Sequence, residues 1–311
     1  MASGIRSIHV LSSFSHTVWD SSIKPAARVA PGDTLTLQIN NASGGQIDAQ
    51  STATVLDTLD FSLLNPVTGP VEVLGAAPGD TLVVDIVAIE FEEWGWTANI
   101  PGFGLLSDDF PEPALRISKV SETTVEFPGG LLVPRNAMIG TIGLPPKAPG
   151  PHSIIPPHPQ GGNMDVRLVG PGSRLRIPVA VPGALLSLGD THAAQGDGEV
   201  CGTGVETASL VTVRVDIEKG RSLASPWLEV TIERNRQGRA LVTTGIGPDL
   251  FQAAKDATRA LIEEVVHRTG ISPIEAYMLA SVAGDLSIAE IVDRPNWVVL
   301  LQLPLSVLGG K

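Results

Sequence analysis

The chain has 311 residues, 43% hydrophobic and 17% charged, so it can bury a substantial core and is not intrinsically disordered. Its net charge of -12 argues against nucleic acid as a partner and suits an enzyme that acts on a neutral or cationic small molecule. No apolar run is long enough to cross a membrane, and the lone cysteine, Cys201, excludes an internal disulfide, so we expect a cytoplasmic protein with no membrane span.

Turn-forming residues and alternating segments predict a chain built mainly of strands. Glycine (33 residues) and proline (25 residues) exceed their average usage, which favours short strands joined by turns. Alternation of apolar and polar residues predicts half-buried strands over 34–39, 82–86, 210–217 and 227–233. The segment PGDTL introduces the first two of these strands, either as an internal repeat or as a reused hairpin turn.

Helix signals appear only late in the chain. Asp249 can N-cap a helix that ends at Gly270, and the run Ser272-Pro273-Ile274-Glu275 is a capping box that starts a second helix, to about Ala283. Before them, residues 94–112 predict a long irregular loop, and the proline- and glycine-rich residues 143–162 predict a linker or a lid. A last buried strand is expected over 297–303.

This order of elements predicts a mainly β fold with a small α+β part at its C-terminal end. We divide the chain into an N-terminal β domain (1–150), a central β region (151–245) and a C-terminal α+β part (246–311). The central region carries the most reactive segment of the sequence.

That segment is residues 183–206, GALLSLGDTHAAQGDGEVCGTGVE. Asp190 and His192 lie two positions apart, so both face the same side if the preceding strand continues. Such a pair supplies two metal ligands, or an imidazole with its orienting carboxylate, whereas the alternative is a polar strand end that faces water. Gln195 and Glu199 follow among glycines that allow tight turns and close approach to a ligand. This density of carboxylates predicts a functional site.

Other side chains each have a functional and a structural interpretation. Cys201 is either a nucleophile or a small buried thiol, the commoner role. Asn163 can bind an amide or a carboxylate and Asp165 can bind a metal, or both belong to a simple Gly–Asn turn. His16 and Trp19 form a compact cluster in which His16 is either a metal ligand or a structural histidine.

Seven motifs run in order along nearly the whole chain. They are H..W (16–19), GGQI (44–47), GP.....A.PGD.L.VDI (69–86), GWTANIPGFG (95–104), MIGTIG (138–143), GGNMD (161–165) and PV.VPGALLSLGD.HAAQGDGEVCGTGVE (178–206). Together these motifs resemble the acetamidase/formamidase family. Two positions depart from the family pattern, because relatives often carry an aspartate where this chain has Asn41, and many carry VEGA where it has Leu74 before Gly75-Ala76.

The resemblance implies hydrolysis of the carbon–nitrogen bond of small linear amides, such as formamide and acetamide, to a carboxylate and ammonia. It also implies a β-sandwich, barrel-like architecture with a small α+β C-terminal part, and a cytoplasmic homo-oligomer. Some relatives act on cyclic amides such as γ-lactams, and some structures suggest a bound zinc or other divalent ion.

Amide hydrolysis needs an activated nucleophile, stabilisation of the oxyanion and a proton for the departing amine. With the resemblance in view, we expect His16, Asp190 and His192 to bind a divalent metal, Zn²⁺, which would lower the pKa of a bound water to about 7. Glu199 would act as general base and then as general acid. The substrate would be held by Asn163, Gln195 and glycine-loop N–H groups in a small pocket walled by Trp19, Trp96 or Phe103.

Two further hypotheses remain open at this point. In one, Cys201 is the nucleophile with Glu199 as its base, and no metal takes part. In the other, the chain is a non-catalytic β-rich protein that captures small amides or sugars through its acidic loop, a reading that the departures at Asn41 and Leu74 favour.

Overall fold

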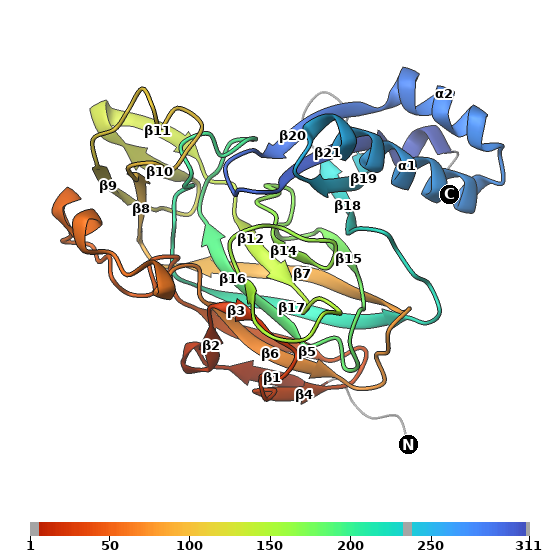
Figure 1. The fold of residues 1–311 in the computed structure, drawn as a ribbon, viewed down its shortest axis with the longest axis horizontal. Coiled ribbons are helices and arrows are strands. Elements are labelled where there is room, and N and C mark those ends of the chain that lie inside the picture. The colour runs from red at the N-terminus through yellow and green to blue at the C-terminus, as the bar shows by residue number, and fades with distance from the viewer. Residues whose placement is uncertain (1–5, 233–237, 309–311) are drawn as a thin grey trace.

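The computed structural model describes residues 6–232 and 238–308. Strands make up 41% of the chain and helices 17%, which confirms a mainly β protein with a small helical part near its C-terminal end (Figure 1). In these ranges the largest sheet has nine strands, in the order β1 (Ser7–Val10), β5 (Thr34–Ile39), β17 (Ser209–Glu218), β7 (Thr81–Phe91), β15 (Arg174–Pro178), β18 (Trp227–Ile232), β19 (Gly238–Gly247), β21 (Trp297–Pro304) and β20 (Asp285–Glu290). This sheet therefore takes strands from all three segments into which we divided the sequence.

A second sheet of six strands, again within the described ranges, carries the residues of the reactive segment. Its order is β14 (Gly161–Asn163), β12 (Met138–Gly143), β16 (Leu186–His192), β6 (Val67–Val73) and β2 (Ser15–His16), with β4 (Ala27–Val29) also paired to β6. Three smaller pairs complete the strands: β3 (Val18–Trp19) with β13 (His152–Ser153), β8 (Trp94–Asn99) with β9 (Ala114–Lys119), and β10 (Thr124–Phe127) with β11 (Leu131–Pro134). Short 3₁₀ turns occupy Ser12–Phe14, Ala53–Thr58, Phe61–Leu63, Pro128–Gly130 and Leu305–Leu308.

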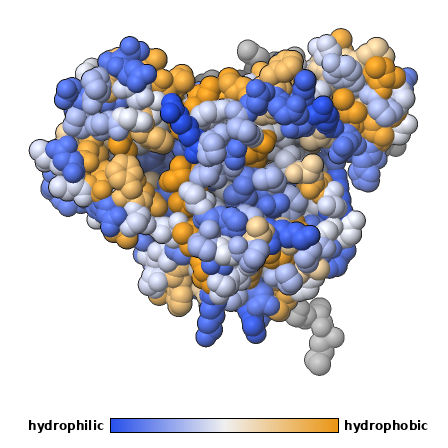
Figure 2. All heavy atoms as spheres, in the orientation of Figure 1, coloured by the Kyte–Doolittle hydropathy of each residue, from blue (hydrophilic) through white to orange (hydrophobic). Residues whose placement is uncertain are grey.

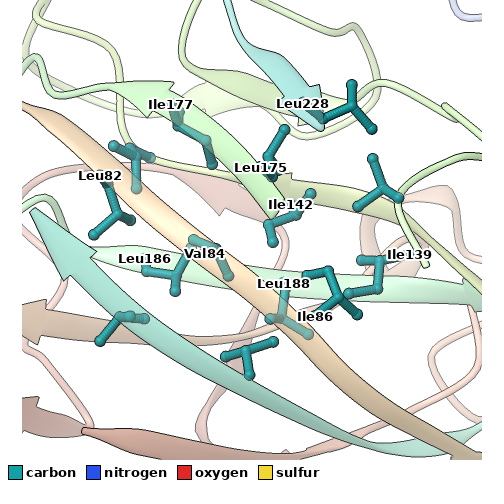
Figure 3. Packing of buried hydrophobic residues seen from close by; sticks show 14 of the residues in the cluster. Leu82, Val84, Ile86, Ile139, Ile142, Leu175, Ile177, Leu186, Leu188 and Leu228 are labelled. Atoms are coloured by element: carbon teal, nitrogen blue, oxygen red, sulfur yellow. The ribbon is translucent and has the colours of Figure 1, made fainter. Parts of the chain in front are cut away.

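The main hydrophobic core lies between the two large sheets (Figure 3). From the nine-stranded sheet it takes Leu82, Val84 and Ile86 of β7, Leu175 and Ile177 of β15 and Leu228 of β18, and from the six-stranded sheet Ile139 and Ile142 of β12 and Leu186 and Leu188 of β16. Because β7 is covered on one side by this core, its apolar residues recur at every second position, which is the pattern that the sequence shows.

Strand β16 is different, because all seven of its residues are buried. A strand without a solvent-facing side must find protein partners for its polar side chains, since an unpaired buried polar group costs about 1–3 kcal/mol. Asp190 and His192 are the charged residues of this strand. Their burial is what makes the end of β16 chemically unusual.

Both predicted helices are present. Helix α1 (Leu250–Thr269) is capped by Asp249, whose side chain accepts a hydrogen bond from Gln252 N, and it ends at Gly270 in a left-handed conformation. Helix α2 (Pro273–Ala283) begins with the capping box of Ser272 and Glu275. In the described residues, neither helix combines the length and apolar composition that a membrane crossing requires.

The two PGDTL segments form the same turn. The side chain of Asp33 accepts from Ala30 N at 2.8 Å, and that of Asp80 accepts from Ala77 N at 2.9 Å. Each turn leads into a strand of the nine-stranded sheet, β5 or β7. A carboxylate that satisfies a backbone donor three residues earlier explains why the same residues recur at both places.

Residues 94–112 differ from the predicted irregular loop. Residues 94–99 form β8, which pairs with β9, and a loop begins only after them. The glycines that suggested a loop have another role here: a Cβ on Gly95 would lie 2.5 Å from Thr207 Oγ1, so the missing side chain lets a neighbouring segment approach. The strand predicted over 227–233 is β18, which ends at Ile232, and residue 233 lies outside the described residues.

Candidate active site

The end of β16 brings Asp190 and His192 into one buried cluster, as their two-residue spacing predicts. His192 is 1% exposed and Asp190 3%. Strand β12 pairs with β16 so that Met138 lies opposite His192, and Thr141 Oγ1 lies 3.2 Å from Asp190 Oδ2. The sheet therefore fixes the backbone on which both side chains stand.

The hydrogen bonds of Gln195 determine which nitrogen of His192 carries a proton. Gln195 Nε2 donates to the carbonyl oxygen of Asp165 at 2.7 Å, which leaves Gln195 Oε1 as an acceptor, 2.8 Å from His192 Nδ1. Nδ1 must then carry a proton. Nε2 is directed to two carboxylates, 3.2 Å from Asp190 Oδ1 and 3.0 Å from Glu206 Oε2.

Two more carboxyls lie on the Nδ1 side of the same ring. Oε1 of Glu199 is 3.9 Å from His192 Nδ1, and Oδ1 of Asp165 is 4.0 Å from it. Glu199 belongs to the loop after β16, and Asp165 follows β14. The imidazole thus stands between two pairs of acidic side chains from different parts of the chain.

The loop between β20 and β21 closes the cluster from the C-terminal part of the chain, above β12 and β14 in Figure 1. Asn163 Nδ2 donates to Asp293 Oδ2 at 2.5 Å, and Asn163 Oδ1 accepts from Asn65 Nδ2 at 3.0 Å and from Thr141 Oγ1. Glu290 Oε1 in turn accepts from the backbone N of Asp293 at 2.5 Å. Asn163 is therefore a connector inside the cluster.

Burial and mutual repulsion hold protons on most of these carboxyls. Burial, followed by the charge of Asp165, raises the pKa of Glu199 well above 4.5. Burial also raises the pKa of Asp165, with help from Asp190. Burial raises the pKa of Glu206 to about 7, against the opposing charge of His192.

The ion pair at Nε2 shifts the pKa values of its two members in opposite directions. Burial works to raise the pKa of Asp190, but the charge of His192 outweighs it and lowers that pKa. Burial works to lower the pKa of His192, but Glu206 and Asp190 raise it well above 6.5. One imidazolium balances one carboxylate, so the remaining carboxyls must keep their protons or meet another cation.

The cluster has the ligand atoms that such a cation needs. Among the described residues, both carboxylate oxygens of Asp165 and Oε2 of Glu206 are buried and make no hydrogen bond of good geometry, although Oε2 of Glu206 lies 3.0 Å from His192 Nε2. In each of two groups, Asp165 with His192 and Glu199, and Asp190 with His192 and Glu206, the possible ligand atoms lie within 4.8 Å of one another. Carboxylate oxygens and an imidazole nitrogen are ligands that Zn²⁺ and other divalent ions accept. The residues therefore fit a divalent metal.

The backbone is shaped to bring these groups together. Asp165, Asp190 and Glu199 all have positive φ angles, 45°, 54° and 43°, in the region that side chains other than glycine rarely adopt. A Cβ on Gly140 would lie 2.4 Å from Asp165 Oδ1 and 2.6 Å from Asp190 Oδ2, so only glycine leaves room for both carboxyls there. Strained residues that persist are concentrated at functional sites, and here they coincide with the acidic cluster.

The structure does not bring His16 and Trp19 to this cluster. His16 Nδ1 lies 2.7 Å from Val18 O and Nε2 lies 2.9 Å from Ser187 Oγ, so protein atoms occupy both ring nitrogens. Trp19 is fully buried and meets His158 edge-on, with ring centroids 5.5 Å apart. These two residues form a structural contact between β2, β3 and the 154–161 loop.

Trp96 is linked to the site through its backbone. Trp96 N donates to Glu206 O at 3.0 Å, and Glu206 N donates to Trp96 O at 2.8 Å. The indole Nε1 of Trp96 donates to Asn41 Oδ1 at 3.2 Å. Asn41, one of the two residues that depart from the family pattern, therefore supports β8, the strand whose Trp96 backbone bonds Glu206. Leu74, the other such residue, is 44% exposed.

Cys201 is a half-buried thiol whose Sγ lies 3.4 Å from Ala98 O. Burial, and then the nearby charge of Glu199, raise the pKa of this thiol above 9.0, which disfavours the thiolate. Phe103, the third aromatic residue that we expected at the pocket, lines a cavity beside the Glu199 loop.

The sequence places Glu206 at the end of the reactive segment without a catalytic or ligand role, and it does not single out Asp293 or Glu290. Glu206 Oε1 does accept from Gly204 N at 2.8 Å, but its other oxygen faces His192. The available signal for the other two was the run EIVD at 290–293, which places carboxyls inside an apolar stretch between two strands. A buried acidic residue in such a run needs a partner elsewhere in the fold.

Curated relatives of this chain have amidase names. An acetamidase of Mycolicibacterium smegmatis is 30% identical over 66% of this chain and 66% of its own length. A formamidase of Methylophilus methylotrophus is 29% identical over 94% of this chain and 89% of its own length.

Solved structures agree with the sequence relatives. Acetamidase from Bacillus halodurans superposes with a TM-score of 0.89 at 33% identity (97% of this chain, 98% of that one), and acetamidase from Yersinia enterocolitica with 0.89 at 30% (99% and 94%). A gamma lactamase from Delftia acidovorans is more distant, with a TM-score of 0.67 at 27% identity (94% and 89%). The sequence profile of the acetamidase/formamidase family matches residues 6–151 and 148–309, and the chain belongs to this family.

Proposed function

We propose that this protein is an amidase that hydrolyses the carbon–nitrogen bond of small linear amides to a carboxylate and ammonia, with the His192 cluster as its active site. Membership of a family whose relatives are formamidases and acetamidases supports the reaction class. One structural observation carries the choice of site: several buried carboxyls surround one histidine, and within the described part of the chain some of their oxygens have no hydrogen-bond partner. Perturbed acidic groups packed around an imidazole are typical of functional sites.

The proposed metal ligands are His192 Nε2, Asp190 and Glu206. Gln195 holds the protonated Nδ1, so loss of the Nε2 proton of the imidazolium would leave a lone pair directed toward both carboxylates. We leave His16 out of this set because both of its nitrogens have protein partners. A bound divalent ion, with Zn²⁺ as the first candidate, would supply a more acidic water and would polarise the amide carbonyl.

We assign proton transfer to Glu199. Its carboxyl stands on the other side of the ring from the proposed ligands, 3.9 Å from His192 Nδ1, and its raised pKa favours uptake of a proton. A group of this kind takes a proton from the attacking water and returns it to the departing amine. Asp165, on the same side, contributes to that raised pKa, because two neighbouring buried carboxyls repel each other when both are ionised.

Asn163 and Gln195 contribute by positioning. The amide of Asn163 already bonds Asp293, Asn65 and Thr141, and that of Gln195 bonds His192 and the backbone of Asp165. The oxygen and the nitrogen of both amides therefore already have protein partners. Their proposed role is to hold Asp293 and His192 at fixed positions, which is what preorganised catalysis requires.

Ammonia release from formamide, acetamide and propionamide, together with ring opening of a γ-lactam, tests the proposed reaction. We expect release from the linear amides that falls after dialysis against a chelator and returns with a divalent metal. Ring opening without ammonia release from the linear amides would transfer the assignment to cyclic amides. Binding of amides without any product would support a non-catalytic binding protein.

We also propose that the chain forms a homo-oligomer. Helix α2 is apolar on its outer side, where Ile274, Tyr277, Met278 and Val282 are 54–79% exposed, and Figure 2 shows orange atoms at this end of the molecule. Clustered apolar residues on a surface mark protein contacts more often than they mark a solvated face. Light scattering should give a mass above 32.5 kDa, and Val282→Glu should lower it toward that of one chain.

The cytoplasm is the proposed location. The support is the lone cysteine, a reduced thiol that forms no bridge within the chain. Cell fractionation of a strain that expresses the protein would test this, with recovery in the soluble cytosolic fraction as the expected result.

A further inference from the structure

A cavity of about 580 Å³ lies outside the acidic cluster, against the loop that carries Glu199. It is lined by segment 102–105, by Ile155 and Leu250, and by residues of the β20–β21 loop with Trp297. Ligand sites for drug-sized molecules occupy roughly 300–1,000 Å³, whereas formamide or acetamide fills only a small part of such a space. The cavity is therefore larger than the smallest amides require.

The walls of this cavity and the acidic cluster share the same backbone segments. Leu105 N donates to Val200 O at 2.9 Å, next to Glu199, and Gly198 N donates to Ala289 O at 2.7 Å on the other side of the loop. Val292 lines the cavity, and its neighbour Asp293 belongs to the cluster. The space thus lies on the outer side of the residues that hold Glu199 and Asp293.

The lining has a consistent chemistry. Phe103, Ile155, Ile291 and Trp297 present apolar side chains, and Arg294 is the cation among the lining residues. Arg294 is exposed, and within residues 6–232 and 238–308 no ion pair joins its guanidinium to a carboxylate. An unpaired guanidinium beside an apolar wall is suited to a carboxylate at the end of a short aliphatic chain.

We propose that this cavity is the substrate subsite of the His192 cluster, and that it selects amides whose aliphatic chain ends in a carboxylate, which Arg294 binds. This inference rests on the proposed amidase function and adds a substrate class to it. The amide end would face Glu199, the chain would lie along Phe103 and Trp297, and the carboxylate would meet Arg294. On a chain of net charge -12, such a cation also offsets the repulsion that an anionic substrate would otherwise meet.

The test compares two amides of equal chain length, pentanamide and glutaramate, which differ in a methyl or a carboxylate at the far end. We expect the wild-type kcat/KM to be higher for glutaramate. Arg294→Gln should lower the ratio of the two kcat/KM values roughly tenfold, mainly through KM for glutaramate, since a hydrogen bond to a charged group has about that effect. Arg28→Gln is the matched control, because Arg28 is an exposed cation paired with Glu72 away from the cavity, and it should leave the ratio as in the wild type.

A second variant tests the wall. Leu105 is 51% exposed, so Leu105→Trp adds bulk to the cavity without disturbing the core. It should lower kcat/KM for both longer amides relative to acetamide.

Calorimetry of glutaramate binding separates the subsite from the reaction, because it needs no turnover. An unchanged ratio in Arg294→Gln, together with equal binding of glutaramate by that variant and the wild type, would overturn the subsite while leaving the amidase function intact. Arg294-dependent binding without hydrolysis of any amide would instead overturn the amidase function and keep the subsite.

Discussion

Nε2 of His192 lies 3.0 Å from Oε2 of Glu206, and both side chains are buried. The two residues also form an isolated β-bridge, so the backbone and the side chains meet at the same place. Among the described residues Oε2 of Glu206 makes no hydrogen bond, and the carboxyl lies beside both the imidazole and Asp190. This contact makes Glu206 a proposed metal ligand beside Asp190 and His192.

Replacement of Glu206 should therefore weaken metal binding more than folding. Glu206→Gln keeps the shape of the side chain and removes the charge, so we expect metal affinity to fall by tenfold or more, a loss on the order of that seen when even supporting residues of metal sites change. Metal analysis after dialysis measures this directly. Asp197→Asn is the control, because Asp197 stands in the same loop but pairs with Arg167 at the surface. Equal metal content in both variants would remove Glu206 from the ligand set.

The stability of the metal-free protein should fall as pH rises. Burial raises the pKa of Glu290 to about 7, against 4.5 for an unburied glutamate, and burial does the same for the pKa of Glu206. Between those two values the folded state binds more protons than the unfolded state, so the contribution is fully present below pH 4.5 and is lost as pH rises to about 7. Calorimetry should show a lower Tm at pH 8 than at pH 5.5.

Glu290→Gln should flatten this slope, because the buried amide has no proton to lose. For Glu290 alone, the pH-dependent change in the free energy of unfolding is at most roughly 3 kcal/mol. Glu126→Gln, at an exposed position of β10, is the control that should leave the slope as it is. A Tm of the metal-free protein that rises from pH 5.5 to 8 would contradict the raised pKa values.

Gly140 has no room for a side chain. A Cβ there would lie 2.4 Å from Asp165 Oδ1 and 2.6 Å from Asp190 Oδ2, so Gly140→Ala must displace two carboxyls of the cluster. We expect a loss of stability of about 1–3 kcal/mol, as for other overpacked sites, together with a loss of metal binding. Urea unfolding and metal analysis measure the two effects. Gly247→Ala is the matched control, since a Cβ at that strand position meets nothing within 4 Å, and a similar cost there would show that the cluster is not the cause.

Cys201 should be dispensable for catalysis. Its thiol bonds Ala98 O, and burial keeps it in the protonated form, which is a poor nucleophile. Cys201→Ser preserves a donor at this position and should leave kcat unchanged within the error of the assay. Loss of activity in this variant, with metal content retained, would revive the route in which Cys201 attacks the substrate.

Local signals explain which parts of the fold could be predicted. The caps of α1 and α2 lie within a few residues of the helix starts, at Asp249 and Ser272, and the alternation that predicts β5 is a property of six consecutive residues. The proximity of Asp190 and His192 has the same origin, because two residues that lie two positions apart in a strand share a face.

Contacts between distant segments explain what could not be predicted. Asp293 and Asn163 are 130 positions apart in the sequence, and the residues around either one do not predict their contact. Glu206 was visible in the reactive segment, but its partner at His192 Nε2 depends on how the following loop returns to Trp96. His16 belongs to a matching motif, yet the direction of its ring is set by Ser187, which only the paired strands bring near.

Ammonia release from acetamide by metal-loaded Glu199→Gln, measured beside the wild type, tests whether Glu199 transfers the proton in amide hydrolysis. The glutamine is the same size and cannot take a proton, so we predict a rate lower by about 10²–10⁴-fold with metal content retained. Asp197→Asn, in the same loop, should keep the wild-type rate. A wild-type rate in metal-loaded Glu199→Gln would contradict the assignment of proton transfer to this residue.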